Sequence, residues 1–265
     1  VTRLSGALEL LQELAPGLSL QASLRGDHSS TWGRQWTPGA GLAWVAAPGL
    51  KLRAAWGKAF RAPSFTELYY DSPAQKGNAA LQPERSRSFE VGADWYGKGG
   101  TTLSATLFRR RDQDLIDWVR RAPKDPWSAA NLGAVRAEGA SLQVSGRPAA
   151  RLGASFGWSW TRLDIPPSDF VSRYAPDCVR HHVTGTLAAD VAAGTVLAAT
   201  CTYKDRALPG PDPLLLSLKL SRRFGSLEAS LQGDNLLDRR WEELQGIPLP
   251  GRTFSAGLRW RQGGR

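Results

Sequence analysis

The chain has 265 residues, which fits one or two domains, and a single large β-barrel is within the range for one. It has no run of about 18 apolar residues, so a transmembrane helix is excluded, whereas strands of a transmembrane barrel need only about 9 to 11 residues each. The formal net charge of +10 is compatible with nucleic acid, an anionic membrane or anionic ligands, but Lys and Arg are dispersed, which favours solvated loops and strand faces. The absence of Met and the start at Val1 favour a fragment or a processed chain.

Apolar and polar residues alternate with a period of two along most of the chain. From Leu18 to Arg25, for example, Leu and Ala alternate with Ser, Gln and Arg. This pattern predicts strands with one apolar and one polar face, and no comparably long helical period competes with it. The strands predicted in this way cover residues 18–25, 50–57, 88–95, 152–161, 214–221, 227–232 and 254–260.

Short and long connectors alternate between these strands. The short ones are rich in turn-forming residues and lie at 15–17, 47–49, 98–100, 147–148, 193–194 and 224–226. The long ones cover 26–35, 61–83, 120–130, 164–177, 204–211 and 238–251. This order predicts an all-β, up-and-down antiparallel sheet of about thirteen strands, with its long loops at one end.

Aromatic residues on the apolar face form two groups. Trp44, Trp95, Phe224 and Trp260 lie beside short turns or the C-terminal end, and Trp56, Trp160 and Tyr203 lie near long loops. Two such belts are expected where strands cross a bilayer, so the pattern predicts a transmembrane β-barrel. The alternative is a soluble sheet whose tryptophans fill a core. Such a core favours large residues in mid-strand, where this chain has Ala and Leu.

The opposite face of the predicted strands carries ionisable and polar groups. A barrel lumen lined in this way is either filled with water or in contact with a polar plug. Because strands begin almost at residue 1, we expect no plug within this chain. The residues assigned to the polar face are Arg53, Glu90, Asp94, Lys219, Arg223, Glu228, Gln232 and Arg259.

The two cysteines are predicted to lie too far apart to form a disulfide. If the turn at 193–194 joins two strands, Cys201 lies opposite Thr186, about eight residues or roughly 26 Å from Cys178. A disulfide needs Cα atoms within about 7 Å of each other. We therefore expect two free thiols.

The segment from Trp56 to Tyr69 interrupts the alternation and opens a long loop. Its sequence, Trp-Gly-Lys-Ala-Phe-Arg-Ala-Pro-Ser-Phe-Thr-Glu-Leu-Tyr, resembles the strand-to-loop motif of TonB-dependent outer-membrane receptors. Residues 78–90 are similar to the family segment that re-enters the barrel, 108–116 and 131–139 fit the same pattern, and 234–253 resemble the last loop and its flanking strands. The motif residues are Phe60, Arg61, Ala62, Pro63, Glu67, Leu68, Tyr69, Asn235, Pro250, Gly251 and Arg252.

The resemblance implies a 22-stranded barrel with an N-terminal plug. On this basis residues 1–265 are one piece, the C-terminal part of the barrel domain, without the plug through which TonB acts. The implied function is active uptake of a metal chelate, such as a ferric siderophore or cobalamin, across the bacterial outer membrane. The implied partners are that chelate, TonB, membrane lipid and lipopolysaccharide, and no nucleic acid, cofactor or protein-bound metal is expected. The vitamin B12 and siderophore receptors are the nearest in detail.

Aromatic and cationic residues of the long loops are the candidates for ligand contact, because binding residues tend to lie on loops of a rigid frame. The alternative, that these side chains pack within their own loops or contact lipopolysaccharide, stays open. The candidates are Phe65, Tyr69, Tyr70, Arg120, Trp127, Arg173 and Tyr174.

Two other classes of function compete with a receptor. A passive porin-like channel requires an even-stranded, complete chain and gives no reason for the Phe-Arg-Ala-Pro and Pro-Gly-Arg motifs. An enzyme is disfavoured because His181 and His182 face opposite ways in a strand and His28 has no partner motif. Asp112 and Asp114 share a face by alternation, about 7 Å apart, which is also ordinary for a solvated strand end. No catalytic motif is present.

Overall fold

The computed structural model describes residues 1–166, 169–174, 178–207, 212–244 and 247–261. The chain divides into two compact units, which are described separately. Unit 1 comprises Val1–Asp94, Thr106–Ala140 and Thr161–Cys178, and unit 2 comprises Trp95–Ala105, Ser141–Trp160 and Val179–Arg265. In the described ranges, no helix has both the length and the apolar character needed to cross a membrane.

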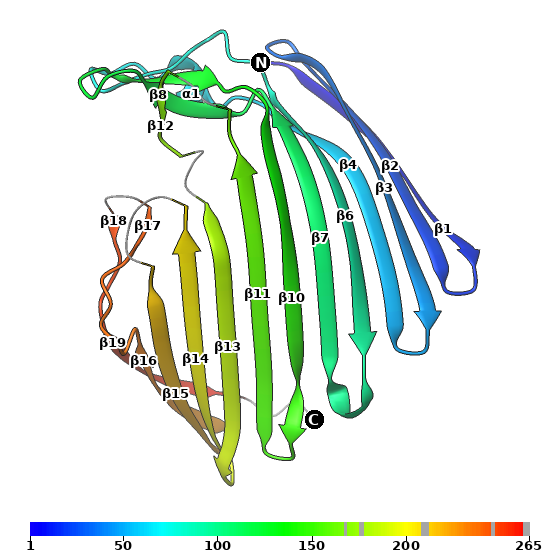
Figure 1. The fold of residues 1–265 in the computed structure, drawn as a ribbon, viewed down its shortest axis with the longest axis vertical. Coiled ribbons are helices and arrows are strands. Elements are labelled where there is room, and N and C mark those ends of the chain that lie inside the picture. Colours follow the sequence, from blue (N-terminus) through cyan, green and yellow to red (C-terminus); the bar gives the residue numbers. More distant parts are fainter. Residues whose placement is uncertain (167–168, 175–177, 208–211, 245–246, 262–265) are drawn as a thin grey trace. The chain divides into compact units, whose positions relative to one another are not determined.

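Among the described residues, 13 strands form one sheet whose spatial order follows the chain order, which confirms the predicted up-and-down topology. Neighbouring pairs such as β1–β2 and β13–β14 are antiparallel, and Figure 1 shows β1 to β4 side by side. The strands are β1 (Arg3–Ala15), β2 (Leu18–Ser29), β3 (Gly33–Ala47), β4 (Leu50–Arg61), β6 (Glu84–Tyr96), β7 (Thr102–Gln113), β10 (Val135–Ala149), β11 (Leu152–Asp164), β13 (Val179–Ala192), β14 (Thr195–Arg206), β15 (Leu214–Phe224), β16 (Leu227–Asp234) and β19 (Thr253–Trp260).

In unit 1 the register confirms which residues share a face. Trp44 lies opposite Leu18 on β2 and Leu52 on β4, and all of these belong to the predicted apolar face. Arg53, on the other face, donates hydrogen bonds to Glu90 and Asp94. The predicted polar face is therefore a network of paired charges, and the apolar face is left exposed.

In unit 2 the same two faces recur. Leu227 lies opposite both Phe224 and Trp260, so these aromatic residues flank Leu227 beside the short turn after β15. Tyr203 lies opposite Leu214 near the other end of the strands. On the polar face, Glu228 lies opposite Arg223 and Arg259. Trp95 is exposed, and Trp160 lies opposite His181.

Two details of the predicted strands were wrong. The connector predicted at 26–35 is short, because β2 continues to Ser29 and β3 begins at Gly33. Here the ladder continues with polar pairs, such as Asp27 opposite Gln35, after the apolar alternation has ended. Cys201 lies opposite Gly185 rather than Thr186, because a bulge between Asp190 and Ala192 shifts the register by one residue.

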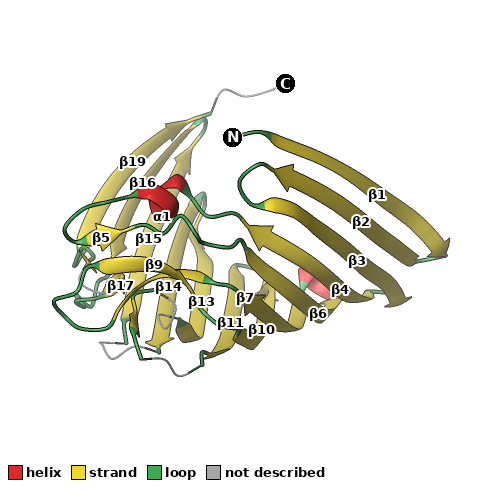
Figure 2. Cartoon of the chain, turned by 90° about the horizontal axis from the view of Figure 1, so that it is seen from above, coloured by secondary structure: helices red, strands yellow, loops and turns green. Residues whose placement is uncertain are grey.

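Four of the predicted long loops contain short strands or a helix that the alternation pattern did not predict. Within the described residues, a second sheet has the order β12-β8-β9-β5. It lies at the loop ends of β4, β6 and β7 (Figure 1), and Figure 2 shows the helix α1 beside β5 and β9. The elements are α1 (Phe65–Tyr69), β5 (Gln75–Lys76), β8 (Ile116–Arg120), β9 (Trp127–Asn131) and β12 (Val171–Ser172). Elsewhere the loops contain the 3-10 turn η1 (Lys98–Gly100) and the strands β17 (Glu242–Leu244) and β18 (Ile247–Pro248).

The small sheet has its own apolar core, formed by Leu81, Ile116, Trp118 and Ala129, with Leu68 and Trp127 packed against it. Alternation predicted that Asp112 and Asp114 share one face of a strand, but β7 ends at Gln113. Asp114 has a φ of 58°, a left-handed conformation that breaks a strand. The chain therefore leaves the large sheet there, and alternation no longer places Asp114 on the face of Asp112.

Candidate functional site

The Phe-Arg-Ala-Pro motif is followed by a capped helical turn. The Ser64 hydroxyl accepts a hydrogen bond from the backbone N–H of Glu67 at 3.2 Å, and the Glu67 carboxylate accepts one from the backbone N–H of Ser64 at 2.7 Å. This is a capping box, which begins α1. The Ser-Phe-Thr-Glu sequence carries its signature, so this helix was detectable from the sequence.

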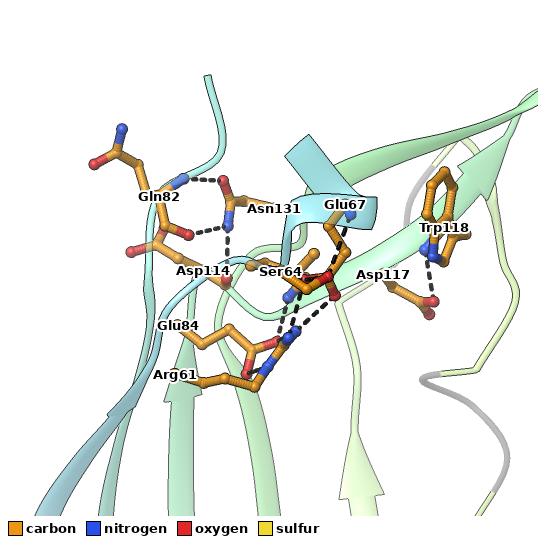
Figure 3. A network of polar contacts seen from close by, with 10 residues as sticks. Arg61, Ser64, Glu67, Gln82, Glu84, Asp114, Asp117, Trp118 and Asn131 are labelled. Carbon is orange, nitrogen blue, oxygen red and sulfur yellow. Dashed lines mark hydrogen bonds and ion pairs between the residues drawn. The ribbon is translucent and has the colours of Figure 1, made fainter. Parts of the chain in front are cut away.

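Arg61 joins this helix to two other elements (Figure 3). Its guanidinium donates to both carboxylate oxygens of Glu67 at 3.0 Å and to both oxygens of Glu84 at 2.7 and 2.8 Å. Glu84 also accepts the backbone N–H of Ile116 at 2.7 Å. One arginine and one carboxylate thus connect β4, α1, β6 and β8. We call Arg61, Glu67 and Glu84 the rim network.

The electrostatics of Glu67 follow from these contacts. Partial burial raises the pKa of its carboxyl group, because burial disfavours the charged form. The hydrogen bonds from Arg61 and from Ser64 outweigh burial and hold the pKa below its ordinary value. Glu67 is therefore ionised at neutral pH and available as an acceptor for Arg61.

Asn131 provides a second junction in Figure 3. Its amide oxygen accepts the backbone N–H of Gln82 at 2.9 Å, and its amide nitrogen donates to the carbonyls of Gln82 and Asp114 at 2.9 and 2.7 Å. The Asn-Leu-Gly segment that resembles the receptor family therefore ties β9 to the chain just before β6. Its role in the structure is to position the small sheet.

Asp117 is a buried carboxylate that the sequence analysis missed. It accepts backbone N–H groups from Trp118 at 2.7 Å and Tyr174 at 3.0 Å, and it also accepts the Ser172 hydroxyl. The residue is only 3% exposed. Asp117 therefore fastens the segment after β12 to β8. An Asp between Ile116 and Trp118 in an apolar strand was a visible signal, but two of these partners, Ser172 and Tyr174, lie more than 50 residues away.

Four of the seven ligand candidates come together on this small sheet. The guanidinium carbon of Arg120 lies 4.4 Å from the ring centroid of Trp127, and that of Arg173 lies 5.4 Å from the same centroid. Arg173 is also 5.3 Å from the ring centroid of Tyr174. Arg120, Trp127, Arg173 and Tyr174 form what we call the cation–aromatic cluster. Its residues come from β8, β9 and the segment after β12.

The other three candidates belong to the helical turn. Phe65 and Tyr69 are stacked, with ring centroids 6.2 Å apart, and both rings are exposed. Tyr70 caps the C-terminal end of α1 and is also exposed. The candidates therefore fall into two groups, one on α1 and one on the small sheet.

The C-terminal motif, in unit 2, anchors a loop. The Asn235 side chain donates to the carbonyls of Arg239 at 2.8 Å and Pro250 at 3.3 Å. The Asp238 carboxylate accepts the backbone N–H of Arg252 at 2.9 Å, and a Cβ on Gly251 would lie 2.7 Å from the same carboxylate. These motif residues shape the connection between β16 and β19.

The described residues contain no group of three or more His, Cys, Asp or Glu side chains that could hold a metal ion. The two adjacent histidines have different partners: the Trp158 indole donates to Nδ1 of His181 at 3.3 Å, whereas Nε2 of His182 lies 3.3 Å from the Thr184 hydroxyl. Asp112 is bound to Arg110 at 2.9 Å. The two histidines therefore do not share a partner.

The family of receptors described as "TonB dependent receptor-like, beta-barrel" matches residues 2–265 of the chain. The chain belongs to this family. Among curated relatives of this receptor barrel, the vitamin B12 transporter BtuB of Vibrio vulnificus is 31% identical over 127 residues, which is 48% of this chain and 20% of that protein. The BtuB of a Vibrio cholerae strain is 35% identical over 100 residues, or 37% of this chain and 16% of that protein.

Solved receptors share the fold of this TonB-dependent receptor barrel. The ferric enterobactin receptor PfeA of Pseudomonas aeruginosa, solved as a mutant with enterobactin, has a TM-score of 0.78 and 21% identity, over 97% of this chain and 45% of that chain. The siderophore receptor PirA of Acinetobacter baumannii has a TM-score of 0.79 and 15% identity, over the same shares. The chain thus spans less than half the length of the receptors it matches. These relatives are described as transporters and receptors, and none of these findings supports the porin alternative.

Proposed function

We propose that residues 1–265 form the C-terminal part of one receptor barrel of the bacterial outer membrane, which takes up a metal chelate such as a ferric siderophore or cobalamin. The family match and the exposed apolar face support the membrane location. In this proposal the seven aromatic residues from Trp44 to Trp260 named above lie at the two membrane interfaces. TonB acts through a plug domain outside these residues.

The cation–aromatic cluster is the single observation that most supports a ligand site on this chain. Its two guanidinium groups lie over aromatic faces, and Arg173 and Tyr174 are exposed. Each guanidinium has five N–H donors, so it can stack on a ring and still donate to a carboxylate or a phenolate oxygen. We propose that Arg120, Trp127, Arg173 and Tyr174 contact the chelate.

Phe65, Tyr69 and Tyr70 are proposed as further contacts on α1. Exposed aromatic rings stack on planar ligand groups and gain free energy from burial of apolar area. The rim network holds the helix at the end of β4, so the position of these rings is fixed relative to that strand. Vitamin B12 and ferric enterobactin, the ligands for which two of the relatives are named, both contain ring systems.

The deciding experiment is equilibrium binding of cobalamin and of ferric siderophores to the full-length receptor that contains this chain. We expect tight binding of one ligand class, and about a tenfold or larger loss in an Arg120→Ala/Arg173→Ala double variant, since each removes a cation that pairs or stacks. The matched control is Arg121→Ala, because Arg121 is exposed and pairs only loosely with Asp169 at 3.7 Å. If the receptor binds neither ligand class, both proposed substrates are excluded. If Arg121→Ala loses as much affinity as the double variant, the cluster is not the ligand site.

A further inference from the structure

The apolar face of unit 1 is hollowed near the loop ends of its first strands. A groove of about 600 Å³ is lined chiefly by Leu4, Gly6, Leu8, Leu24, Gly26 and Trp36. Gly6 and Gly26 lie opposite each other on β1 and β2. A Cβ on Gly6 would meet no atom within 4 Å, whereas one on Gly26 would lie 2.7 Å from the Trp36 ring. Gly6 thus leaves the groove open, and the Trp36 indole, which packs over Gly26, forms its wall.

A smaller cationic pocket continues from this groove. It has a volume of about 130 Å³ and is lined mainly by Trp36, Lys58, Phe60, Arg85, Arg87 and Gln113. Trp36 lines both cavities. The apolar groove and the cationic pocket are therefore adjacent parts of one surface.

The charge of this surface is one-sided. Arg34 and His28 line the groove as well. The groove's carboxylate, Asp27, is engaged by Arg25 at 2.7 Å and by the Ser5 hydroxyl at 2.6 Å. In the cationic pocket, Arg85 donates to Gln35 and lies 3.7 Å from Asp114.

Lys58 and Arg87, by contrast, form no ion pair within the part of the chain that the structure describes. An anion bound in the pocket therefore has two cations available to it. No carboxylate lines this pocket among the described residues.

The cations begin where the apolar band ends. On the apolar face of β4, Lys58 lies next to Trp56 towards the loop end of the strand. On the apolar face of β6, Arg87 lies next to Phe89 towards the loop end of that strand. At the other ends of these strands the same face carries Leu52 and Trp95. Basic residues that are dispersed in the sequence are therefore brought together by alternation at one edge of the apolar face.

We propose that this surface binds a phospholipid with a net negative charge, with an acyl chain in the groove and the anionic headgroup phosphate in the pocket beside Lys58 and Arg87. An acyl chain gains free energy by leaving water for the apolar groove, and a phosphate is attracted by cations next to an apolar surface. A nucleic acid offers phosphates but no chain for the groove. The proposal rests on the proposed membrane location and adds a defined lipid site to it.

The test is native mass spectrometry of the full-length receptor that contains this chain, released from detergent, with phosphatidylglycerol or phosphatidylcholine of identical acyl chains as probes. We expect about a tenfold preference for phosphatidylglycerol. Lys58→Glu/Arg87→Glu is expected to abolish the preference. Gly6→Leu, at a position where an added Cβ meets no atom within 4 Å, is expected to fill the groove and weaken the binding of both lipids. Lys98→Glu/Lys124→Glu changes the net charge equally at residues outside both cavities and is expected to leave the preference intact.

Equal binding of the two lipids, or the same loss in the control pair, overturns the proposal. So does displacement of phosphatidylglycerol by inorganic phosphate combined with no effect of Gly6→Leu, which identifies a simple anion site. If charge reversal prevents folding, the Lys58→Gln/Arg87→Gln double variant is tested instead, provided that its circular dichroism spectrum matches that of the wild type. Insertion into phosphatidylcholine vesicles and chelate binding are measured on the same preparations, so failure of the lipid site is distinguished from failure of the membrane location or the receptor function.

Discussion

Arg61 and Glu84 are joined by two parallel hydrogen bonds of 2.7 and 2.8 Å, although 23 residues separate them in the sequence. Arg61 is the last residue of β4 and Glu84 the first of β6. This fork geometry is specific to arginine, since lysine carries a single point charge. The pair therefore closes the loop from 62 to 83 at its base.

Replacement of Arg61 by Lys tests this closure. We expect the free energy of local unfolding to fall by about 1–2 kcal/mol. This is at the low end for hydrogen bonds of charged groups, because the Arg61 side chain is half exposed. The large sheet is expected to keep its thermal stability. Hydrogen exchange at the Ile116 amide, which donates to Glu84, reports the effect. Arg180→Lys, which alters an ion pair with Asp205 in unit 2, is the control and is expected to leave that amide unchanged.

The lowered pKa of Glu67 predicts how the stability of α1 depends on pH. In the unfolded chain the carboxyl group has its ordinary pKa of about 4.3, and in the folded chain the pKa is lower. Between these two values the unfolded state binds more protons than the folded state. The contribution of Glu67 to the stability of α1 is therefore complete above the ordinary pKa and is lost as pH falls through the folded pKa. Protease cleavage within 64–70 is therefore expected to increase below about pH 4. Glu67→Gln is expected to raise cleavage at pH 7 and to flatten the pH profile; a profile like that of the wild type contradicts this role.

Asp117 is predicted to position the cation–aromatic cluster without contacting a ligand. Asp117→Ala leaves the N–H group of Tyr174 without its acceptor, which costs about 1–3 kcal/mol at a buried site. We expect faster hydrogen exchange at Tyr174 together with weaker chelate binding. The control is Asp125→Asn, because the Asp125 carboxylate accepts the Ala122 N–H in the turn between β8 and β9. Unchanged exchange at Tyr174 in Asp117→Ala counts against the positioning role.

Gly251 is predicted to be intolerant of any side chain. A methyl group there would lie 2.7 Å from the Asp238 carboxylate, which holds the Arg252 N–H. Gly251→Ala is expected to displace Asp238 and to destabilise the connection between β16 and β19 by about 1–3 kcal/mol. Gly185→Ala, where a Cβ meets nothing within 4 Å, is the matched control. Urea unfolding of both variants checks the difference, and equal midpoints contradict the prediction.

The faces of the large sheet were predictable because alternation is a local property. Trp56 and Arg53 differ in parity, so they had to lie on opposite faces of β4. The register of Cys201 was not predictable to the residue, because a one-residue bulge between Asp190 and Ala192 has no clear signature in the sequence. A single bulge is enough to shift every pair beyond it.

The residue types of the candidate site were predictable from the sequence, but the arrangement of these residues in space was not. Arg120, Trp127, Arg173 and Tyr174 were identifiable as cationic and aromatic loop residues. Their proximity depends on the pairing of Val171 with Arg120 and on the bonds of Asp117, which join segments about 50 residues apart. Such pairings are fixed by packing between distant segments, and a local sequence pattern does not encode them.

The turn between β8 and β9 has two internal hydrogen bonds, from the Ala122 N–H to the Asp125 carboxylate and from the Asp125 N–H to the Ala122 carbonyl. Its contacts to residues outside the turn include Arg120, which donates to the Pro123 carbonyl, and Asp169, which lies 3.7 Å from Arg121. The anchors of the small sheet, Asp117 and Asn131, lie outside it. Residues 121–126 can therefore be exchanged as a cassette without loss of the scaffold. The same position is therefore a natural place to graft a designed loop next to Arg120 and Trp127.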